Sequence, residues 1–191
     1  MKKIILLVTI LICGNILFAK NEFTEEQKLA TTAKVWGFLK YYHPEVASGI
    51  FNWDEELFKI LPEVRNSRSK EELSEIYLKW INGLGNIDLC IDCKVKNNVD
   101  YFNENFNLDW ISDTETFTEE LSNKLKFIEF NRHQGKKYYV SVARRKIGNI
   151  KVTNELEYND FNWKNEDLRL LTLFRYWNII EYFFLINISP I

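Results

Sequence analysis

The stretch that most constrains this chain is residues 167–184, DLRLLTLFRYWNIIEYFF, the most apolar helix-length run outside the N-terminus. Twelve of its eighteen residues are aliphatic or aromatic, so a helix here would keep only a narrow polar stripe. The pattern therefore predicts a terminal helix that is buried on nearly all sides. Only seven residues follow it, so its cover must come from elsewhere: it either folds back on the first helix or leaves an exposed aromatic patch.

Four capping patterns predict further helices upstream. In each, Ser, Thr or Asn is followed three positions later by Glu or Gln and then by an apolar periodic run. The pairs are Thr24 with Gln27, Asn52 with Glu55, Ser69 with Glu72, and Thr116 with Glu119. We expect Pro44 and Pro62 to end the first two helices and Gly83 to cap the third. The acidic residues in the first turns are explained by the helix dipole, not by catalysis.

Period-two alternation on both sides of Gly148 predicts a β-hairpin over residues 137–158. An Asn- and Asp-rich stretch, residues 86–114, is expected to be a long loop pinned by aromatic rings. The predicted fold is mainly α (α+β). A helical domain over residues 20–163 contains the loop and the hairpin, and residues 164–191 begin a second helical segment.

The N-terminus has the pattern of an export signal, with Lys2 and Lys3 before an apolar run and Ala19 before the polar continuation. We predict a signal peptide over residues 1–19, cleaved after Ala19. A lipoprotein site at Cys13 is less favoured because Ile12 stands where a small residue is usual. The apolar run is shorter than the ~20 residues that span a bilayer, so we expect a periplasmic or extracellular protein without a stable membrane span.

Few residues suggest chemistry. With 25 basic and 27 acidic residues the chain has no basic field that would favour nucleic acid. Cys90 and Cys93 form a C-x-x-C motif, for which a disulfide is favoured in an exported chain. Half a zinc site is one alternative, but no second pair of ligands follows in the sequence. A redox-active pair is the other, but the motif lies in an irregular stretch. No cofactor, metal site or catalytic residue is predicted, since neither G-x-S-x-G nor a Ser with a recognisable base occurs.

An internal repeat relates the first helix to the last at an offset of 141 residues, with chance similarity of two aromatic helices as the alternative. The matched pairs are Leu29 with Leu170, Thr31 with Thr172, Lys34 with Arg175, Trp36 with Trp177, and Tyr41 with Tyr182. Around these positions lie the candidates for contact with a partner, which are Trp36, Tyr41, His43, Arg175 and Trp177. For His43, at a helix end before Pro44, a structural role is the stronger reading.

Four segments carry a family resemblance: KLATTAKVWGFLKYYHPEV, FNWDEELFKILP, the C-x-x-C before NVDYF, and LFRYWNIIEYFF. Together they resemble the N-terminal region of exported Bacteroidetes-type tail-specific (C-terminal processing) serine peptidases of family 41, over residues 24–184. The resemblance implies a non-catalytic helical domain that packs beside a peptidase domain and shapes substrate access. It transfers no catalytic residue, so we expect the chain alone not to cleave peptides.

In those relatives the last motif continues with Pro-Tyr-Lys-Tyr, whereas this chain reads FFLINI. Phe-Phe-Pro-Tyr-Lys-Tyr can be encoded by a run of T-rich codons. Deletion of one T from this run shifts the frame, so that it encodes Phe-Phe-Leu-Ile-Asn and then Ile or Met. Our hypothesis is that residues 185–191 are a frameshifted tail before a lost peptidase domain. The expected partners are polypeptide substrate, that peptidase domain, or a second copy bound through the terminal helix. The alternative function is a free-standing exported module that binds a peptide or glycan on an aromatic surface.

Overall fold

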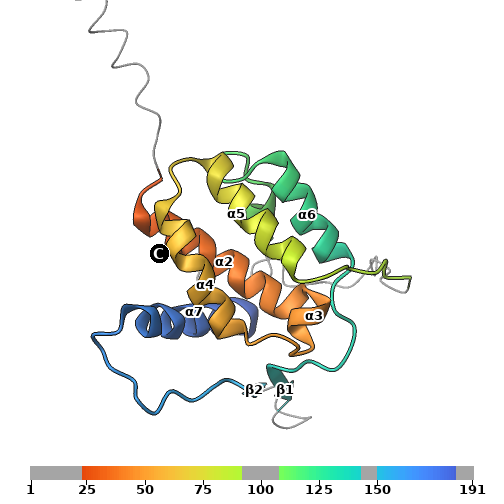
Figure 1. Ribbon diagram of the computed structural model, residues 1–191. Coiled ribbons are helices and arrows are strands. Elements are labelled where there is room, and N and C mark those ends of the chain that lie inside the picture. Colours follow the sequence, from red (N-terminus) through yellow and green to blue (C-terminus); the bar gives the residue numbers. More distant parts are fainter. Residues whose placement is uncertain (1–22, 92–107, 143–149, 184–191) are drawn as a thin grey trace, which may run out of the picture.

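The computed structural model describes residues 23–91, 108–142 and 150–183. This part of the chain holds six α-helices, one 3-10 helix and one two-stranded hairpin (Figure 1). In chain order they are α2 (Glu25–Tyr42), α3 (Pro44–Ala47), α4 (Trp53–Asn66), α5 (Lys70–Gly83), η1 (Asp109–Ser112), α6 (Glu119–Phe130), β1 (Val140–Val142), β2 (Ile150–Val152) and α7 (Glu166–Phe183). The prediction of a mainly helical fold with a small hairpin is confirmed.

Helix α2 is the centre of the fold. It packs against α3, α4 and α7, while α5 packs on α4, and α6 packs on α5 and η1. In Figure 1, α5 and α6 lie on one side of α2 and α4, and α7 lies on the other. The side chains of Trp36, Phe38 and Leu39 are fully buried. Ten residues of α2 are buried in all, which makes it the core helix.

Three of the predicted helix starts are confirmed, and the fourth is displaced. Thr24 forms a complete capping box with Gln27, and Asn52 and Ser69 cap α4 and α5. For α6 the cap is Thr118, whose hydroxyl oxygen accepts from the Leu121 N–H at 3.4 Å. The predicted cap Thr116 instead donates to an Asp113 carboxylate oxygen at 2.6 Å, in the turn before the helix.

Two predicted helix ends are wrong. Pro62 lies inside α4, which continues to Asn66. The exposed Pro62 ring faces solvent, and burial of Val64 in the core stabilises the following turn. Gly83 is the last residue of α5 and Leu84 is the C-cap. The left-handed backbone after this helix belongs to Gly85, with φ of 100°.

Helix α7 lies beside α2, and the two run in the same direction. The Arg65 guanidinium contacts both Glu25, at 3.3 Å, and Glu166, at 2.6 Å, so the two N-termini are neighbours. At the other end the rings of Tyr41 and Tyr182 are 5.1 Å apart. Glu25 and Glu166 differ by the repeat offset, as do the two tyrosines. The matched positions of the repeat therefore lie side by side.

The prediction that the terminal helix is buried on nearly all sides is wrong. Four of its residues are buried, namely Leu171, Phe174, Asn178 and Tyr182. By contrast, Leu173, Tyr176 and Trp177 are 58%, 65% and 48% exposed. The helix contacts α2 and α4, which cover one stripe. Folding back on the first helix and leaving an aromatic patch, posed as alternatives, therefore occur together.

The hairpin is antiparallel and short. Val140 pairs with Val152 and Val142 with Ile150. The Tyr139 carbonyl extends this pairing by accepting from the Thr153 N–H at 2.9 Å. Several predicted features lie outside the described residues: Cys13, Ala19 and the signal peptide, Cys93, residues 143–149 with the Gly148 turn, and residues 185–191.

Candidate binding surface

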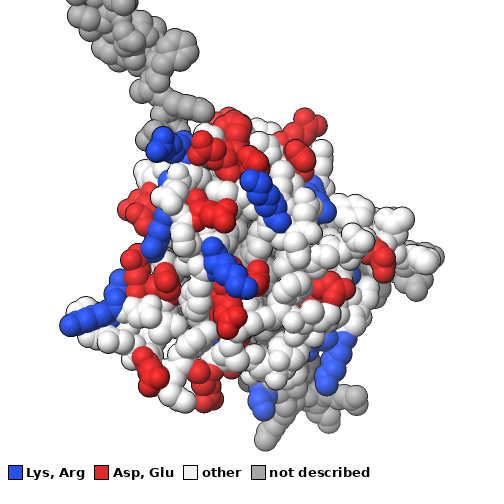
Figure 2. Space-filling view, in the orientation of Figure 1, with Lys and Arg blue, Asp and Glu red and all other residues white. Residues whose placement is uncertain are grey.

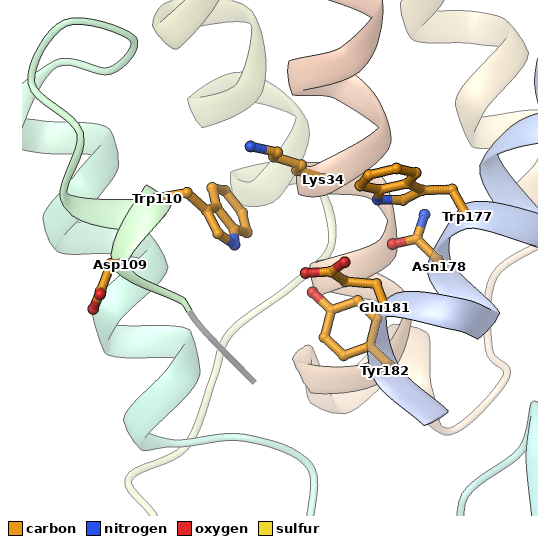
Figure 3. Close-up of a pocket in the computed structure, with 7 residues that line it drawn as sticks. All are labelled: Lys34, Asp109, Trp110, Trp177, Asn178, Glu181 and Tyr182. Carbon is orange, nitrogen blue, oxygen red and sulfur yellow. The ribbon is translucent and has the colours of Figure 1, made fainter. Parts of the chain in front are cut away.

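A pocket lies between η1 and α7, with α2 behind it (Figure 3). Its volume is ≈ 270 Å³. In Figure 3 the Trp110 and Trp177 indoles stand on opposite sides, and the Lys34 side chain lies between them. Glu181 and Tyr182 form the α7 wall together with Asn178, and the Asp109 carboxylate points away from the other labelled side chains. The arrangement combines two indole faces with one ammonium and one carboxylate.

Trp110 is held by the core beneath it. Its indole meets the Phe38 ring edge-on, with 5.9 Å between centroids, and the Phe117 ring at the same distance. Phe38 and Phe117 are both fully buried, and Trp110 is half-buried. One face of this pocket wall is therefore fixed by packing while the other remains accessible, as expected of a preformed site.

The α7 wall is rigid at its base and open above it. The Asn178 side-chain amide donates to the carbonyls of Ala33, at 3.0 Å, and Phe174, at 2.8 Å, which fastens α7 to α2. Burial raises the pKa of Tyr182 well above its usual value, so its hydroxyl stays neutral. Trp177 is 48% exposed on the turn above. Its indole is available to a ligand at the pocket rim.

A second hollow, an apolar groove of ≈ 370 Å³, follows the line between α2 and α7. It shares Lys34 and Trp177 with the pocket and extends toward the N-terminal ends of both helices. The other lining residues are Glu26, Leu29, Ala30, Ala33, Leu170, Leu173 and Phe174. Pocket and groove are therefore neighbouring parts of one face. We call this face the α2–α7 face.

The five predicted contact residues lie in different environments. Trp36 is fully buried, where its indole N–H donates to the Trp53 carbonyl and the Trp53 indole N–H donates in return, both at 3.1 Å. His43 is also fully buried. Tyr41 is half-buried against Tyr182. Of the five, Trp177 alone lines the pocket.

The fifth predicted residue, Arg175, belongs to a largely buried ionic cluster that ties the hairpin segment to the helices. Its guanidinium pairs with Asp54, which is 4% exposed, and with Glu155 at 3.0 Å. Lys40, 1% exposed, pairs with the same Glu155 carboxylate. The Tyr158 hydroxyl donates to Asp54 at 3.1 Å. Two cations and two carboxylates thus satisfy one another, which indicates a structural role.

Burial acts strongly on the ammonium group in this cluster. It lowers the pKa of Lys40, and the Glu155 carboxylate partly offsets that effect. The Lys40 ammonium also lies over the Trp36 and Tyr139 rings, at 4.6 and 4.5 Å from their centroids. Sequence reasoning missed Lys40, Asp54 and Glu155. Lys40 falls on an apolar stripe and Asp54 in an acidic first turn, so their type and spacing do not reveal a shared site.

His43 has an unusual environment at the α2–α3 junction. Among the described residues, neither ring nitrogen has a hydrogen-bond partner. Burial, with a smaller effect from Lys124, lowers the pKa of His43 to about 4. The imidazole is therefore neutral at ordinary pH. Protonation would place an unpaired charge in the core.

Cys90 is disulfide-bonded, and its backbone N–H donates to the Asn131 side-chain oxygen at 2.8 Å. Cys93, the predicted partner, lies outside the described residues. In the ranges that the structure covers, no group of three or more His, Cys, Asp and Glu side chains is placed to hold a metal ion. Figure 2 shows acidic and basic side chains interspersed over the face in view.

Within the described ranges, no helix combines the length and the apolar character needed to cross a membrane. No known protein family, curated protein or solved structure matches the chain.

Proposed function

We propose that this chain is the non-catalytic helical domain of an exported tail-specific serine peptidase of family 41. In this role the domain packs beside a peptidase domain and holds polypeptide substrate. The observation that supports a holding role is the pocket formed by Trp110, Lys34 and Trp177. Indole faces give a large contact area at little entropic cost, and polar groups fix the orientation of a bound chain.

The pocket chemistry suits an extended polypeptide. Apolar side chains of the substrate would stack on Trp110 and Trp177, while the Lys34 ammonium and the Glu181 carboxylate offer a donor and an acceptor for peptide groups. Neither group is a nucleophile with a base beside it, so the proposed role is binding without cleavage.

Fluorescence anisotropy with fluorescein-labelled casein, an unstructured polypeptide, tests this role. We expect saturable binding that Trp110→Ala weakens about tenfold, since aromatic contacts at a hot spot are worth ~1–3 kcal/mol. Trp163→Ala is the matched control, because Trp163 is 68% exposed outside the α2–α7 face. Gel electrophoresis of the same mixtures should show intact casein. Cleavage by the pure chain, or binding that is insensitive to Trp110→Ala, contradicts the proposal.

The assignment to a peptidase has its own test in the genome. Sequencing the locus should reveal a peptidase-coding segment beyond the Phe184 codon, in another reading frame if the slip hypothesis is correct. A locus without such a segment favours the alternative function, a free-standing exported module. The same pocket supports that alternative, since indoles flanked by an amide, an ammonium and a carboxylate can also bind a glycan. Competition of the labelled casein by soluble oligosaccharides separates the two ligand classes.

A further inference from the structure

The outer stripe of α2 carries opposite charges at its two ends. Glu26, Ala30 and Lys34 follow one another at four-residue spacing and are all exposed on the α2–α7 face. The helical rise places Glu26 and Lys34 ~12 Å apart. Neither takes part in an ion pair with the residues that the structure describes. The stripe therefore has an acidic residue at one end, the small side chain of Ala30 in the middle and a basic residue at the other end.

The surface beside this stripe is apolar. Leu173, 58% exposed, and Trp177, 48% exposed, stand along α7, and Leu29, Ala33 and Phe174 line the groove between the helices. The exposed Ala30 allows close approach of another helix, because the distance between packed helices depends on side-chain size at the contact. An exposed apolar strip with charged ends is typical of an interaction surface.

We propose that the α2–α7 face binds a second copy of this chain, with the two α2 helices antiparallel across a two-fold axis. An axis that lies in the interface and crosses α2 at Ala30 reverses the helix direction. It places Glu26 of each copy opposite Lys34 of the other copy. The same rotation lays groove against groove, which covers Leu173 and Trp177. Such an isologous contact is self-complementary in charge and closes as a dimer.

Other arrangements of two copies lack this match. A parallel arrangement would place Glu26 opposite Glu26 and Lys34 opposite Lys34, which is repulsive. An 18-residue helix is ~27 Å long and two packed helices are ~20 Å wide, so the face measures roughly 500 Å² per copy. About 1,000 Å² in total is at the low end for specific interfaces. The dimer should therefore be weak, with Kd on the order of micromolar.

Self-association goes beyond polypeptide holding, and its surface overlaps the pocket only in part. The pocket depends on Trp110, whereas the dimer depends on Ala30 and Leu173. Because Lys34 and Trp177 belong to both sites, dimerisation should compete with polypeptide binding. A dimer would thus keep the pocket partly covered until substrate or another domain displaces the second copy.

Sedimentation equilibrium of the purified chain, over a concentration series, tests the two-fold register. Glu26→Lys alone and Lys34→Glu alone should each raise the dimer Kd about tenfold, since each places two like-charged pairs across the axis. The combined variant Glu26→Lys/Lys34→Glu should return Kd to within about twofold of the original value. Lys79→Glu, on an exposed part of α5, is the charge-matched control and should leave Kd unchanged. Circular dichroism verifies that each variant is folded.

Leu173→Asp tests the apolar part, because it buries a charge in the contact, and should abolish the dimer. A chain that stays monomeric at every concentration overturns the proposal. A dimer whose Kd is unchanged by the single charge substitutions, or is not restored by the double substitution, also overturns it. Trp110→Ala should leave the dimer Kd unaltered while weakening casein binding. Failure of self-association and failure of the proposed function are therefore distinguishable.

Discussion

Helices α2 and α7 have the same length and lie in register side by side, yet α2 is central in the fold and α7 lies at its edge. Trp36 and Trp177, which are aligned at the 141-residue offset, are 0% and 48% exposed. The difference comes from neighbours: α2 packs against α3, α4 and α7 and also contacts α5 and η1, whereas α7 packs against α2 and α4. A uniformly apolar helix therefore does not by itself identify the centre of a fold. The number of elements packed around it decides its burial.

The equivalent tryptophans should differ most in their effect on stability. Trp36→Ala removes a fully buried indole and should lower the free energy of unfolding by about 3–5 kcal/mol. Trp177→Ala should lower it by less than about 1 kcal/mol, since the indole is half in solvent. Urea unfolding followed by far-UV circular dichroism measures both. Equal losses would mean that α7 is as enclosed as α2.

The equivalent cations Lys34 and Arg175 provide the next largest contrast. Arg175→Met leaves the buried Asp54 carboxylate without its guanidinium partner, and we expect a loss of about 2–3 kcal/mol in unfolding free energy. Lys34→Met should change it by no more than about 0.5 kcal/mol, because Lys34 is exposed. The same urea titration compares them. An Arg175→Met variant as stable as Lys34→Met would show that the ionic cluster contributes no net stability.

At Gly37, α2 lies directly against the Asn178 side chain of α7. A Cβ at this position would lie 1.6 Å from the Asn178 side-chain oxygen. Gly37→Ala should therefore separate α2 from α7 at a cost of about 1–3 kcal/mol in unfolding free energy. Adding Asn178→Ala removes the clashing amide, and the double-mutant cycle should show a coupling above about 0.5 kcal/mol. Simple additivity of the two losses would contradict this contact.

At its C-terminal end α2 also buries an imidazole, which makes its packing sensitive to pH. Folding lowers the pKa of His43 from its ordinary 6.5 to about 4, so below pH 6.5 the unfolded chain binds more protons than the folded one. The contribution of His43 to the free energy of unfolding is therefore complete above pH 6.5 and declines as pH falls toward 4. At pH 5 the free energy of unfolding should be lower by roughly 1–2 kcal/mol. This loss of stability should disappear in the His43→Gln variant. It should persist in the His133→Gln variant, because the His133 imidazole is half-exposed.

Local chemistry made the helices predictable. Thr24, Asn52 and Ser69 cap helices as expected, because a cap depends on residues only three positions apart. The error at Pro62 has the opposite cause. A proline weakens the helix locally, but burial of Val64 stabilises the next turn, and that burial depends on distant residues.

The candidate site was only partly predictable for the same reason. The repeat points to Trp177, but Trp110 lies in a stretch with no periodicity and is brought to the opposite side of the pocket only by tertiary packing. Its ring partner Phe38 is far from it in sequence, and the second partner, Phe117, is also far from Phe38. Lys40 and Asp54 likewise meet Glu155 and Arg175 across more than a hundred residues. No local pattern encodes such contacts.

The α2–α7 face should be open on a single chain and covered when a second copy binds. Hydroxyl-radical footprinting read by mass spectrometry measures this residue by residue. In dilute protein, Leu173, Tyr176 and Trp177 should be oxidised strongly while Trp36 and Phe38 are protected. Above the dimer Kd, protection of Leu173 and Trp177 should increase, and that of exposed Trp163 should not. Protection of Trp177 equal to that of Trp36 in dilute protein would show that the α2–α7 face is not open on a single chain.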